Sequence, residues 1–216
     1  ANHGRGWPAV HPRGQDRAAP APARGGGRPA SLGHGWRMQK ASTILMVVLA
    51  FAGCDDDRGP TATAELKALG GSGVTGKATF SPQGGRVHVE AELSGLTPGK
   101  HGFHIHEFGD CSAPDGKSAG GHFNPQGHEH GAPGASSHPG DLGNIEADAN
   151  GRATLSLVVD QVTIDSGALG IVGRGLIVHE KADDLVSQPV GEAGGRVACA
   201  VIKADSGETK PVIESP

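Results

Sequence analysis

The chain has 216 residues, of which 37 are glycine, 15 are proline and only 3% are aromatic. This composition is rich in turns and poor in large core side chains, so it argues against a helical bundle and favours short strands joined by loops. The formal charge is −4, and it becomes −10 once residues 1–53, with seven basic residues and one acidic residue, are set aside, so nucleic acid is not an expected partner.

The first 37 residues are predicted to lie outside the folded domain. They contain six Arg, no Lys and five Pro, and their apolar residues show no periodicity. A segment of this kind cannot bury a core. Met38 follows directly, so we expect it to be the true start and residues 1–37 to be a mistaken upstream translation. A disordered natural leader is the alternative interpretation.

Residues 38–53 have the features of an export signal. Lys40 supplies a positive start, an apolar run extends from Ile44 to Ala52, and small residues precede Cys54. The run is too short for an ordinary transmembrane helix and is typical of a secretory signal. Because its AGC ending resembles a bacterial lipoprotein signal, we expect lipid on Cys54 to anchor the mature protein to a membrane.

Strand signals follow a polar tether at residues 54–62. The clearest lies between Arg86 and Leu93, where apolar residues alternate with polar ones. Asn150-Gly151 is a strong hairpin signal between two further strands. Eight strands are expected in all, at residues 63–68, 74–80, 86–93, 101–106, 141–147, 153–159, 173–179 and 196–203.

Short strands at this spacing predict an all-β fold, either an antiparallel sandwich or a Greek-key barrel. The folded domain is expected to cover residues 63–205, with a disordered tail at 206–216. Two long segments without strand signals, 108–140 and 180–195, are expected to be the loops that carry the function.

The pair His104 and His106 points to a metal site. Side chains two apart on a β-strand lie on the same face of the sheet, so both can bind one ion, while Ile105 would point into the apolar core. Imidazole suits copper and zinc. Together with His179, the pair could hold zinc and a water, as hydrolytic sites do.

A second group of possible ligands lies in a segment rich in glycine, proline and serine. It has little apolar material of its own, so a metal would supply the missing order. Three nitrogen ligands and one oxygen ligand form a closed tetrahedral set, which is typical of structural zinc. The four residues are His122, His130, His138 and Asp141.

Five motifs identify a family that the chain resembles. In chain order they are GFHIHEFGD, AGGHFNP, GDLGN, VHEKADD and GGRVAC, within residues 63–202. They closely resemble the copper/zinc superoxide dismutases, and the resemblance implies a flattened eight-stranded barrel. It implies copper on His104, His106, His122 and His179. It implies zinc on His122, His130, His138 and Asp141, with His122 shared between the two metals as an imidazolate.

The resemblance also implies further roles. Arg196 would be a catalytic residue that binds the incoming anion beside the copper, and its alternative is an ordinary surface arginine. His122 would be catalytic through the proton that it carries. Asp183 would accept hydrogen bonds from His104 and His130 and so couple the two metals. His130 is preferred over His128 because the family places glycine directly after this ligand.

The three cysteines divide by location. With Cys54 carrying lipid, Cys111 and Cys199 remain as a pair, which suits an oxidising compartment. The resemblance implies that they form a disulfide between the metal loop and the last strand. Two buried free thiols are the alternative.

The sequence therefore predicts a superoxide dismutase in the bacterial periplasm or cell envelope, tethered to a membrane by lipid. It would convert superoxide into oxygen and hydrogen peroxide through Cu(II) and Cu(I), as antioxidant defence outside the cytoplasm. The sequence does not determine the oligomeric state: a homodimer is one option, through a surface that the sequence does not identify. Two other classes stay open: a copper-handling module on the same barrel, and a structural or adhesive sandwich that binds only zinc.

Overall fold

The structure is a computed structural model, and it describes residues 59–206. Residues 1–37, the expected export signal at 38–53, the lipid-bearing Cys54 and the tail from residue 207 lie outside the described residues. Within residues 59–206, no helix is long and apolar enough to cross a membrane.

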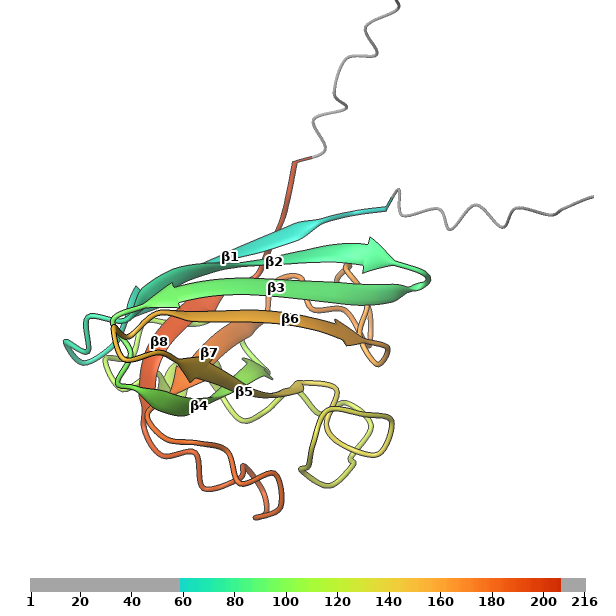
Figure 1. Ribbon diagram of the computed structural model, residues 1–216. Helices are drawn as coiled ribbons and strands as arrows, with labels where there is room; N and C mark the ends of the chain where they lie inside the picture. The colour runs from blue at the N-terminus through green and yellow to red at the C-terminus, as the bar shows by residue number, and fades with distance from the viewer. Residues whose placement is uncertain (1–58, 207–216) are drawn as a thin grey trace, which may run out of the picture. The chain divides into compact units, whose positions relative to one another are not determined.

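The described part of the chain is built from antiparallel strands (Figure 1). A single short 3₁₀ turn, η1 (Lys117–Ala119), interrupts the first long loop. The strands are β1 (Ala62–Ala68), β2 (Thr75–Gln83), β3 (Arg86–Ser94), β4 (Gly99–His106), β5 (Asp141–Ala147), β6 (Ala153–Val159), β7 (Gly175–His179), β8 (Arg196–Val201) and β9 (Lys203–Ala204).

These strands close into a barrel. The order of neighbours is β2-β3-β6-β5-β4-β7-β8-β1-β9, and a further pairing of β1 with β2 joins the two ends. In Figure 1, β1, β2, β3 and β6 run side by side as one layer, and β4, β5, β7 and β8 form the other. Closure leaves few exposed strand edges. The fold class expected from the sequence, an eight-stranded Greek-key barrel, is therefore confirmed.

The alternation seen in the sequence accounts for the core. On β3, Val87, Val89, Ala91 and Leu93 are buried while the residues between them are more exposed. They pack with Phe80, Phe103 and Ile105 in one apolar cluster that fills the barrel. Each strand thus contributes its inward side chains to a single core, which stabilises the fold through buried apolar area.

One expected strand is divided in two, while the others differ at most in their bounds. The last one, expected over residues 196–203, is divided into β8 and β9 with a break at Ile202. At the break, the amide of Ile202 donates 2.9 Å to the carbonyl of Arg174, and the Ile202 carbonyl accepts from Gly173. Ile202 is fully buried. The chain therefore bonds there to the segment before β7, and β9 resumes pairing with β1.

Two long loops leave the barrel, between β4 and β5 (residues 107–140) and between β7 and β8 (residues 180–195). These are the two loops that the sequence predicts. In Figure 1 they extend from the layer that contains β4, β5, β7 and β8. Both begin directly after a histidine, His106 at the end of β4 and His179 at the end of β7.

Candidate metal centre

Strand β4 positions the first two histidines of the site. His104 and His106 are both buried, at 0% and 1% exposure, and their ring centroids lie 6.5 Å apart. Ile105 between them is fully buried in the apolar core. The two-residue period of the strand thus places both imidazoles on one face and the isoleucine on the other.

His122 lies in the first loop but is held as firmly as a strand residue. It forms an isolated bridge with His106. The next residue, Phe123, donates its amide to the carbonyl of Ile105 at 2.8 Å, and its own carbonyl accepts from Gly140 at 2.9 Å. These backbone bonds attach the segment alongside the end of β4, so the His122 ring reaches the two strand histidines.

The structure brings the first set of four histidines together. Their ligand atoms all lie within 4.8 Å of one another, and all four residues are buried. The ring nitrogens of His106 and His179, both Nε2, are 3.4 Å apart. The members are His104, His106, His122 and His179. We call this set the first cluster.

Hydrogen bonds on the outer side fix how these rings point. His104 Nε2 bonds Asp183 at 2.8 Å, and His106 Nδ1 donates to the Gly120 carbonyl at 3.1 Å. His179 Nδ1 lies 3.4 Å from the Gly194 carbonyl. In each ring one nitrogen is thereby occupied and the other faces the cluster, which is the arrangement of metal-binding histidines.

The second set lies on the other side of His122. His122, His130, His138 and Asp141 have ligand atoms within 4.8 Å of one another and are all buried. Asp141 Oδ1 lies 2.8 Å from His122 Nδ1 and 3.4 Å from His138 Nδ1. Its Oδ2 accepts from the amides of Gly131 and His138. We call this set the second cluster, and it shares His122 with the first.

Unpartnered nitrogens show that the two clusters fit metal ions. Among the described residues, the buried side-chain atoms without a hydrogen-bond partner are all histidine nitrogens of these clusters. A buried polar atom without a partner costs free energy, so it calls for an explanation. Metal coordination would satisfy each of them. The atoms are His104 Nδ1, His122 Nε2, His130 Nδ1 and His138 Nδ1.

Asp183 connects the two clusters through hydrogen bonds to one histidine of each. Its Oδ2 bonds His104 Nε2 at 2.8 Å, and its Oδ1 bonds His130 Nε2 at 2.9 Å. The amide of Leu185 donates to the same Oδ1 at 2.7 Å. Gly191 packs so closely that a Cβ there would collide with the Asp183 carboxylate, and its φ of 69° also favours glycine.

Two histidines next to the cluster residues in the sequence or in space stay outside both clusters. The ring nitrogens of His101 lie 2.9 Å from the His179 carbonyl and 2.8 Å from the Thr97 carbonyl. His128, the rival of His130 in the sequence, bonds the Ser137 carbonyl at 2.9 Å through Nδ1. Both therefore brace main chain around the metal loops.

Three histidines of the first cluster favour the neutral imidazole. Burial, followed by charge repulsion from His122, lowers the pKa of His104 and of His106 well below the usual 6.5. Burial lowers the pKa of His179 to about 4. Burial alone would raise the pKa of Asp141, but hydrogen bonds from His122 and Gly131 keep it lowered. Neutral imidazole and ionised carboxylate are the forms that bind metals.

A hollow of about 600 Å³ leads from the surface to the first cluster. His106, His122 and His179 line it, as does Arg196. The Arg196 guanidinium donates to the carbonyls of Gly116 at 2.5 Å and Gly120 at 2.6 Å, which fixes its position. Burial lowers the pKa of Arg196, and Asp115 partly offsets this. An arginine remains charged in proteins, so a cation lies beside the cluster.

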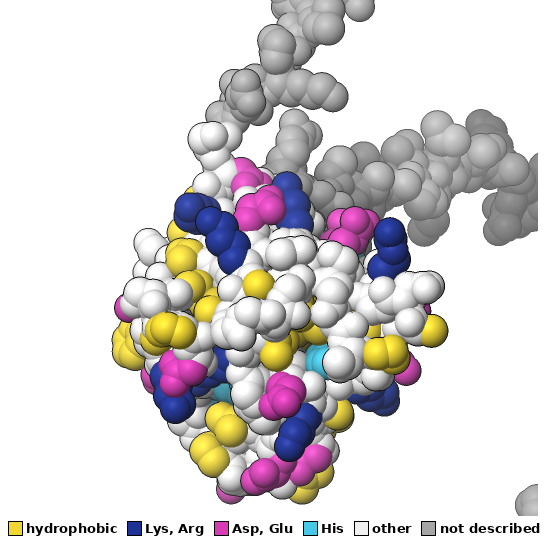
Figure 2. Space-filling view, turned by 90° about the vertical axis from the view of Figure 1, so that its left-hand side faces the viewer, with side chains coloured by type: hydrophobic (Ala, Val, Ile, Leu, Met, Phe, Trp, Pro, Cys, Tyr) yellow, Lys and Arg dark blue, Asp and Glu magenta, His cyan; other side chains and the backbone are white. Residues whose placement is uncertain are grey.

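Little of the histidine clusters reaches the surface. In Figure 2, hydrophobic, basic and acidic side chains are interspersed over the visible face, and histidine shows only in small spots between them. Every member of the two clusters is buried. The hollow beside Arg196 is therefore an opening through which a small ligand could reach the first cluster.

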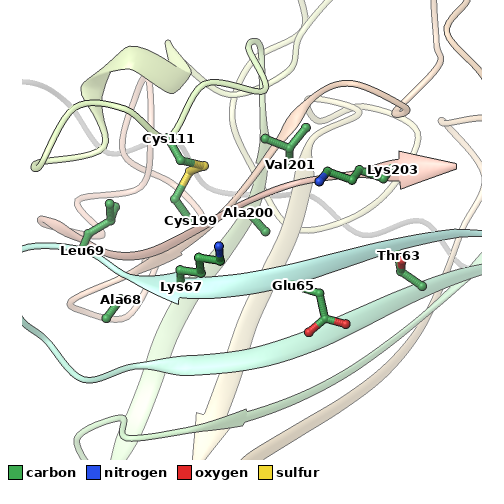
Figure 3. A pocket seen from close by; sticks show the side chains of 10 residues that line it. All are labelled: Thr63, Glu65, Lys67, Ala68, Leu69, Cys111, Cys199, Ala200, Val201 and Lys203. Atoms are coloured by element: carbon green, nitrogen blue, oxygen red, sulfur yellow. A yellow bond between two sulfur atoms is a disulfide. The ribbon is translucent and has the colours of Figure 1, made fainter.

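Cys111 and Cys199 form a disulfide. It joins the first long loop to β8, and the same loop carries Gly116 and Gly120, which hold Arg196. A separate hollow of about 590 Å³ lies against this disulfide, with Lys67 and Lys203 along its wall (Figure 3). No cluster histidine lines it, so it is not part of the metal centre.

Comparison with known proteins places this geometry in a family. The sequence model of copper/zinc superoxide dismutase matches residues 74–202. That span includes every member of both clusters and the disulfide. The chain belongs to the copper/zinc superoxide dismutase family. The family's enzymes are superoxide dismutases that bind copper and zinc. The protein is therefore a superoxide dismutase that uses copper and zinc.

Two relatives illustrate the match. The chain is similar to an extracellular Cu-Zn superoxide dismutase of Drosophila melanogaster, with 48% identity over 139 residues, which are 60% of this chain and 75% of the relative. It is also similar to the crystal structure of the clock protein EA4, with 44% identity and a TM-score of 0.61. That match covers 66% of this chain and 93% of the other.

Sequence reasoning missed two amide side chains. Asn144 accepts from the Asp183 amide at 2.8 Å and donates to the Asp183 carbonyl at 2.9 Å. Gln188 makes the same pair of bonds with His130. Asn144 lies within the GDLGN motif, so the motif was a signal for it, whereas no pattern around Gln188 indicates its partner.

Proposed function

We propose that this superoxide dismutase acts outside the cytoplasm, with copper at the first cluster and zinc at the second. The observation that carries the metal assignment is the shared His122, whose Nδ1 faces Asp141 while its buried Nε2 has no partner among the described protein groups. Each ring nitrogen thus serves a different cluster. The copper ligands would be His104, His106, His122 and His179, and the zinc ligands His122, His130, His138 and Asp141.

Copper, when bound, supplies one-electron chemistry that oxidises one superoxide to oxygen and reduces the next to peroxide. The reaction consumes two protons for each hydrogen peroxide. His122 can hold one of them at Nε2, which is buried and lies in the cluster that the hollow reaches. Held through Nδ1 in the second cluster, which it shares with Asp141, the ring would keep its orientation for this transfer.

Arg196 would bind the anionic substrate. Its guanidinium lines the same hollow as His106 and His179. The chain beyond residue 53 carries a formal charge of −10, which repels an anion as a whole. A fixed cation at the mouth of the site would offset this repulsion locally and raise the rate of encounter.

The proposed location rests on three separate features. Residues 38–53 resemble an export signal, Cys54 stands where lipid would be attached, and the Cys111–Cys199 disulfide suits an oxidising compartment. The Drosophila relative is an extracellular enzyme. The mature protein would then begin at a lipid-modified Cys54.

Metal analysis tests the two sites. We expect one copper and one zinc per chain, and dismutase activity in the loaded protein. His122→Ala should lower the affinity of both sites, because it removes a ligand from each. Full retention of copper and zinc by His122→Ala would show that the two sites do not share this residue.

Mass spectrometry of the protein from its native membrane tests the location. The mature N-terminus should be a lipidated Cys54, and Cys54→Ser should release or mislocalise the enzyme while leaving its activity unchanged. Peptides that contain Trp7 or Trp36 in the native product would exclude this processing.

A further inference from the structure

The side chain of Gln188 pairs with the main chain of His130. The His130 amide donates to Gln188 Oε1 at 2.8 Å, and Gln188 Nε2 donates to the His130 carbonyl at 2.9 Å. The two bonds run in opposite senses, like those of a hydrogen-bonded residue pair in an antiparallel sheet. Gln188 lies in the loop between β7 and β8, and His130 lies in the loop between β4 and β5. The side-chain amide of Gln188 thus joins the two long loops with the bonds that a neighbouring strand would otherwise make.

The same loop also holds the His130 ring. His130 Nε2 bonds Asp183 Oδ1 at 2.9 Å, which leaves Nδ1 as the buried nitrogen without a hydrogen-bond partner. Asp183 is fixed in turn by the pair of bonds with Asn144 on β5. Gln188 therefore binds the main chain of His130, and Asp183 separately binds its ring.

Hydrogen bonds, such as the one from the Gly131 amide to Asp141 Oδ2, order this part of the first loop more than apolar contacts do. Between His128 and His138 the only apolar side chains are two alanines and one proline. Burial of apolar area therefore contributes little to fixing His130, and the position depends on hydrogen bonds. Gln188 also donates to the Val186 carbonyl at 3.2 Å, which holds the amide itself in place.

We propose that Gln188 is a positioning residue for the zinc site: it holds the His130 main chain so that Nδ1 stays directed at the second cluster. The inference rests on the proposed zinc site at that cluster. Loss of Gln188 would let the loop around His130 move away, so zinc would dissociate faster while the first cluster, set on β4 and β7, keeps its copper.

Zinc release from the fully loaded, disulfide-intact chain tests the proposal. Gln188→Met removes both bonds at nearly constant size. Release to a chromogenic chelator should become about tenfold faster, the low end of the effect of residues that orient metal ligands. Copper content should stay unchanged. Gln83→Met, at the end of β2, is the matched control and should release zinc at the parent rate.

Amide hydrogen exchange supplies a readout independent of metal. In the metal-free protein, the His130 amide should exchange faster in Gln188→Met, because its acceptor is gone. Gln188→Glu keeps an acceptor but has no group to donate to the His130 carbonyl. Its His130 amide should therefore stay protected, and its zinc release should lie between the parent and Gln188→Met.

The outcomes separate two failures. Parent-like zinc release in Gln188→Met, in a protein where His130→Ala loses zinc, overturns the role of Gln188 and leaves the zinc site standing. Retention of zinc by His130→Ala overturns the zinc site itself. A loss of copper equal to the loss of zinc in Gln188→Met would mean a general loosening of the fold, and it also counts against the proposal.

Discussion

The two clusters differ in what holds their ligands. In the first, His104 and His106 lie on β4, His179 ends β7, and His122 is bridged to His106. In the second, only Asp141 lies on a strand, and His130 and His138 come from a loop with almost no apolar residues. The barrel thus sets one site, while the other depends on side-chain hydrogen bonds.

The difference separates two ways to build a metal site in one fold. Ligands on strands are ordered by the core before any metal arrives, so binding there orders little further chain. Ligands on a loop are ordered at a cost in conformational entropy, which metal binding must offset. The zinc site should therefore contribute more to the order of the first long loop than the copper site does.

Removal of one ligand from each cluster tests this comparison most directly. His106→Ala should lose copper and keep most zinc, and its activity should fall more than about 100-fold, because loss of a ligand exceeds the effect of an outer partner. His130→Ala should lose mainly zinc. Metal content and dismutase rates measure both changes.

Hydrogen exchange shows where order is lost. In His130→Ala, amides of residues 123–140 should exchange faster while those of β4 and β7 stay protected. In His106→Ala, the loop should keep its protection. Equal loss of protection in both regions would contradict the distinction between a site set by strands and a site set by a loop.

The disulfide is the covalent link between the loop that carries the second cluster and the barrel. Replacing both Cys111 and Cys199 by serine frees a closed segment with a sequence separation of 88. In the chain-entropy account, this should lower the free energy of unfolding by on the order of 4 kcal/mol. Denaturant unfolding of the metal-free protein measures this free energy. A decrease of less than about 1 kcal/mol would show that contacts other than the disulfide order the loop.

The sequence predicted the regular half of the molecule better than the irregular half. The period of two on β3 and β4 placed the core residues and the pair His104 and His106, because strand geometry alone determines which face a side chain takes. The composition of the loop and the types of ligand indicated the second set, and the resemblance to the family assigned His122 and His179 to the copper site. The break at Ile202 and the partner of Gln188 depend on how distant segments meet, and no local pattern contains that information.

Acid should destabilise the metal-free protein. The pKa of His179 is lowered to about 4 from 6.5 by burial, so the unfolded chain binds more protons between these values. The contribution of His179 to the free energy of unfolding is therefore fully present above about pH 6.5. It is lost as the pH drops towards 4, and the loss amounts to about 3 kcal/mol.

His104 and His106 shift in the same direction and add to this loss. Denaturant unfolding of the metal-free protein between pH 7 and pH 4.5 measures the slope. In His179→Gln the slope should be smaller, because one of the titrating groups is gone. A stability that stays level over this range would show that the cluster is hydrated and open in the absence of metal.

The smallest expected effect concerns Arg196, which belongs to neither cluster and is proposed to act on the substrate alone. Arg196→Glu should lower activity about 10- to 100-fold, the range by which local charge changes association rates. Arg196→Lys keeps the charge without the planar fork and should lose only part of the activity. Both variants should keep copper and zinc, since no cluster nitrogen bonds Arg196.

A matched control separates local from global charge. Arg152→Glu makes the same change in net charge at an exposed turn outside the hollow, and it should reduce activity far less than Arg196→Glu. The parent should also lose activity as salt rises, because screening acts over about 10 Å at 0.1 M, and Arg196→Glu should lose this dependence. If Arg196→Glu stays fully active with both metals bound, or if Arg152→Glu matches its loss, the charge of the whole chain governs encounter and the cation in the hollow does not.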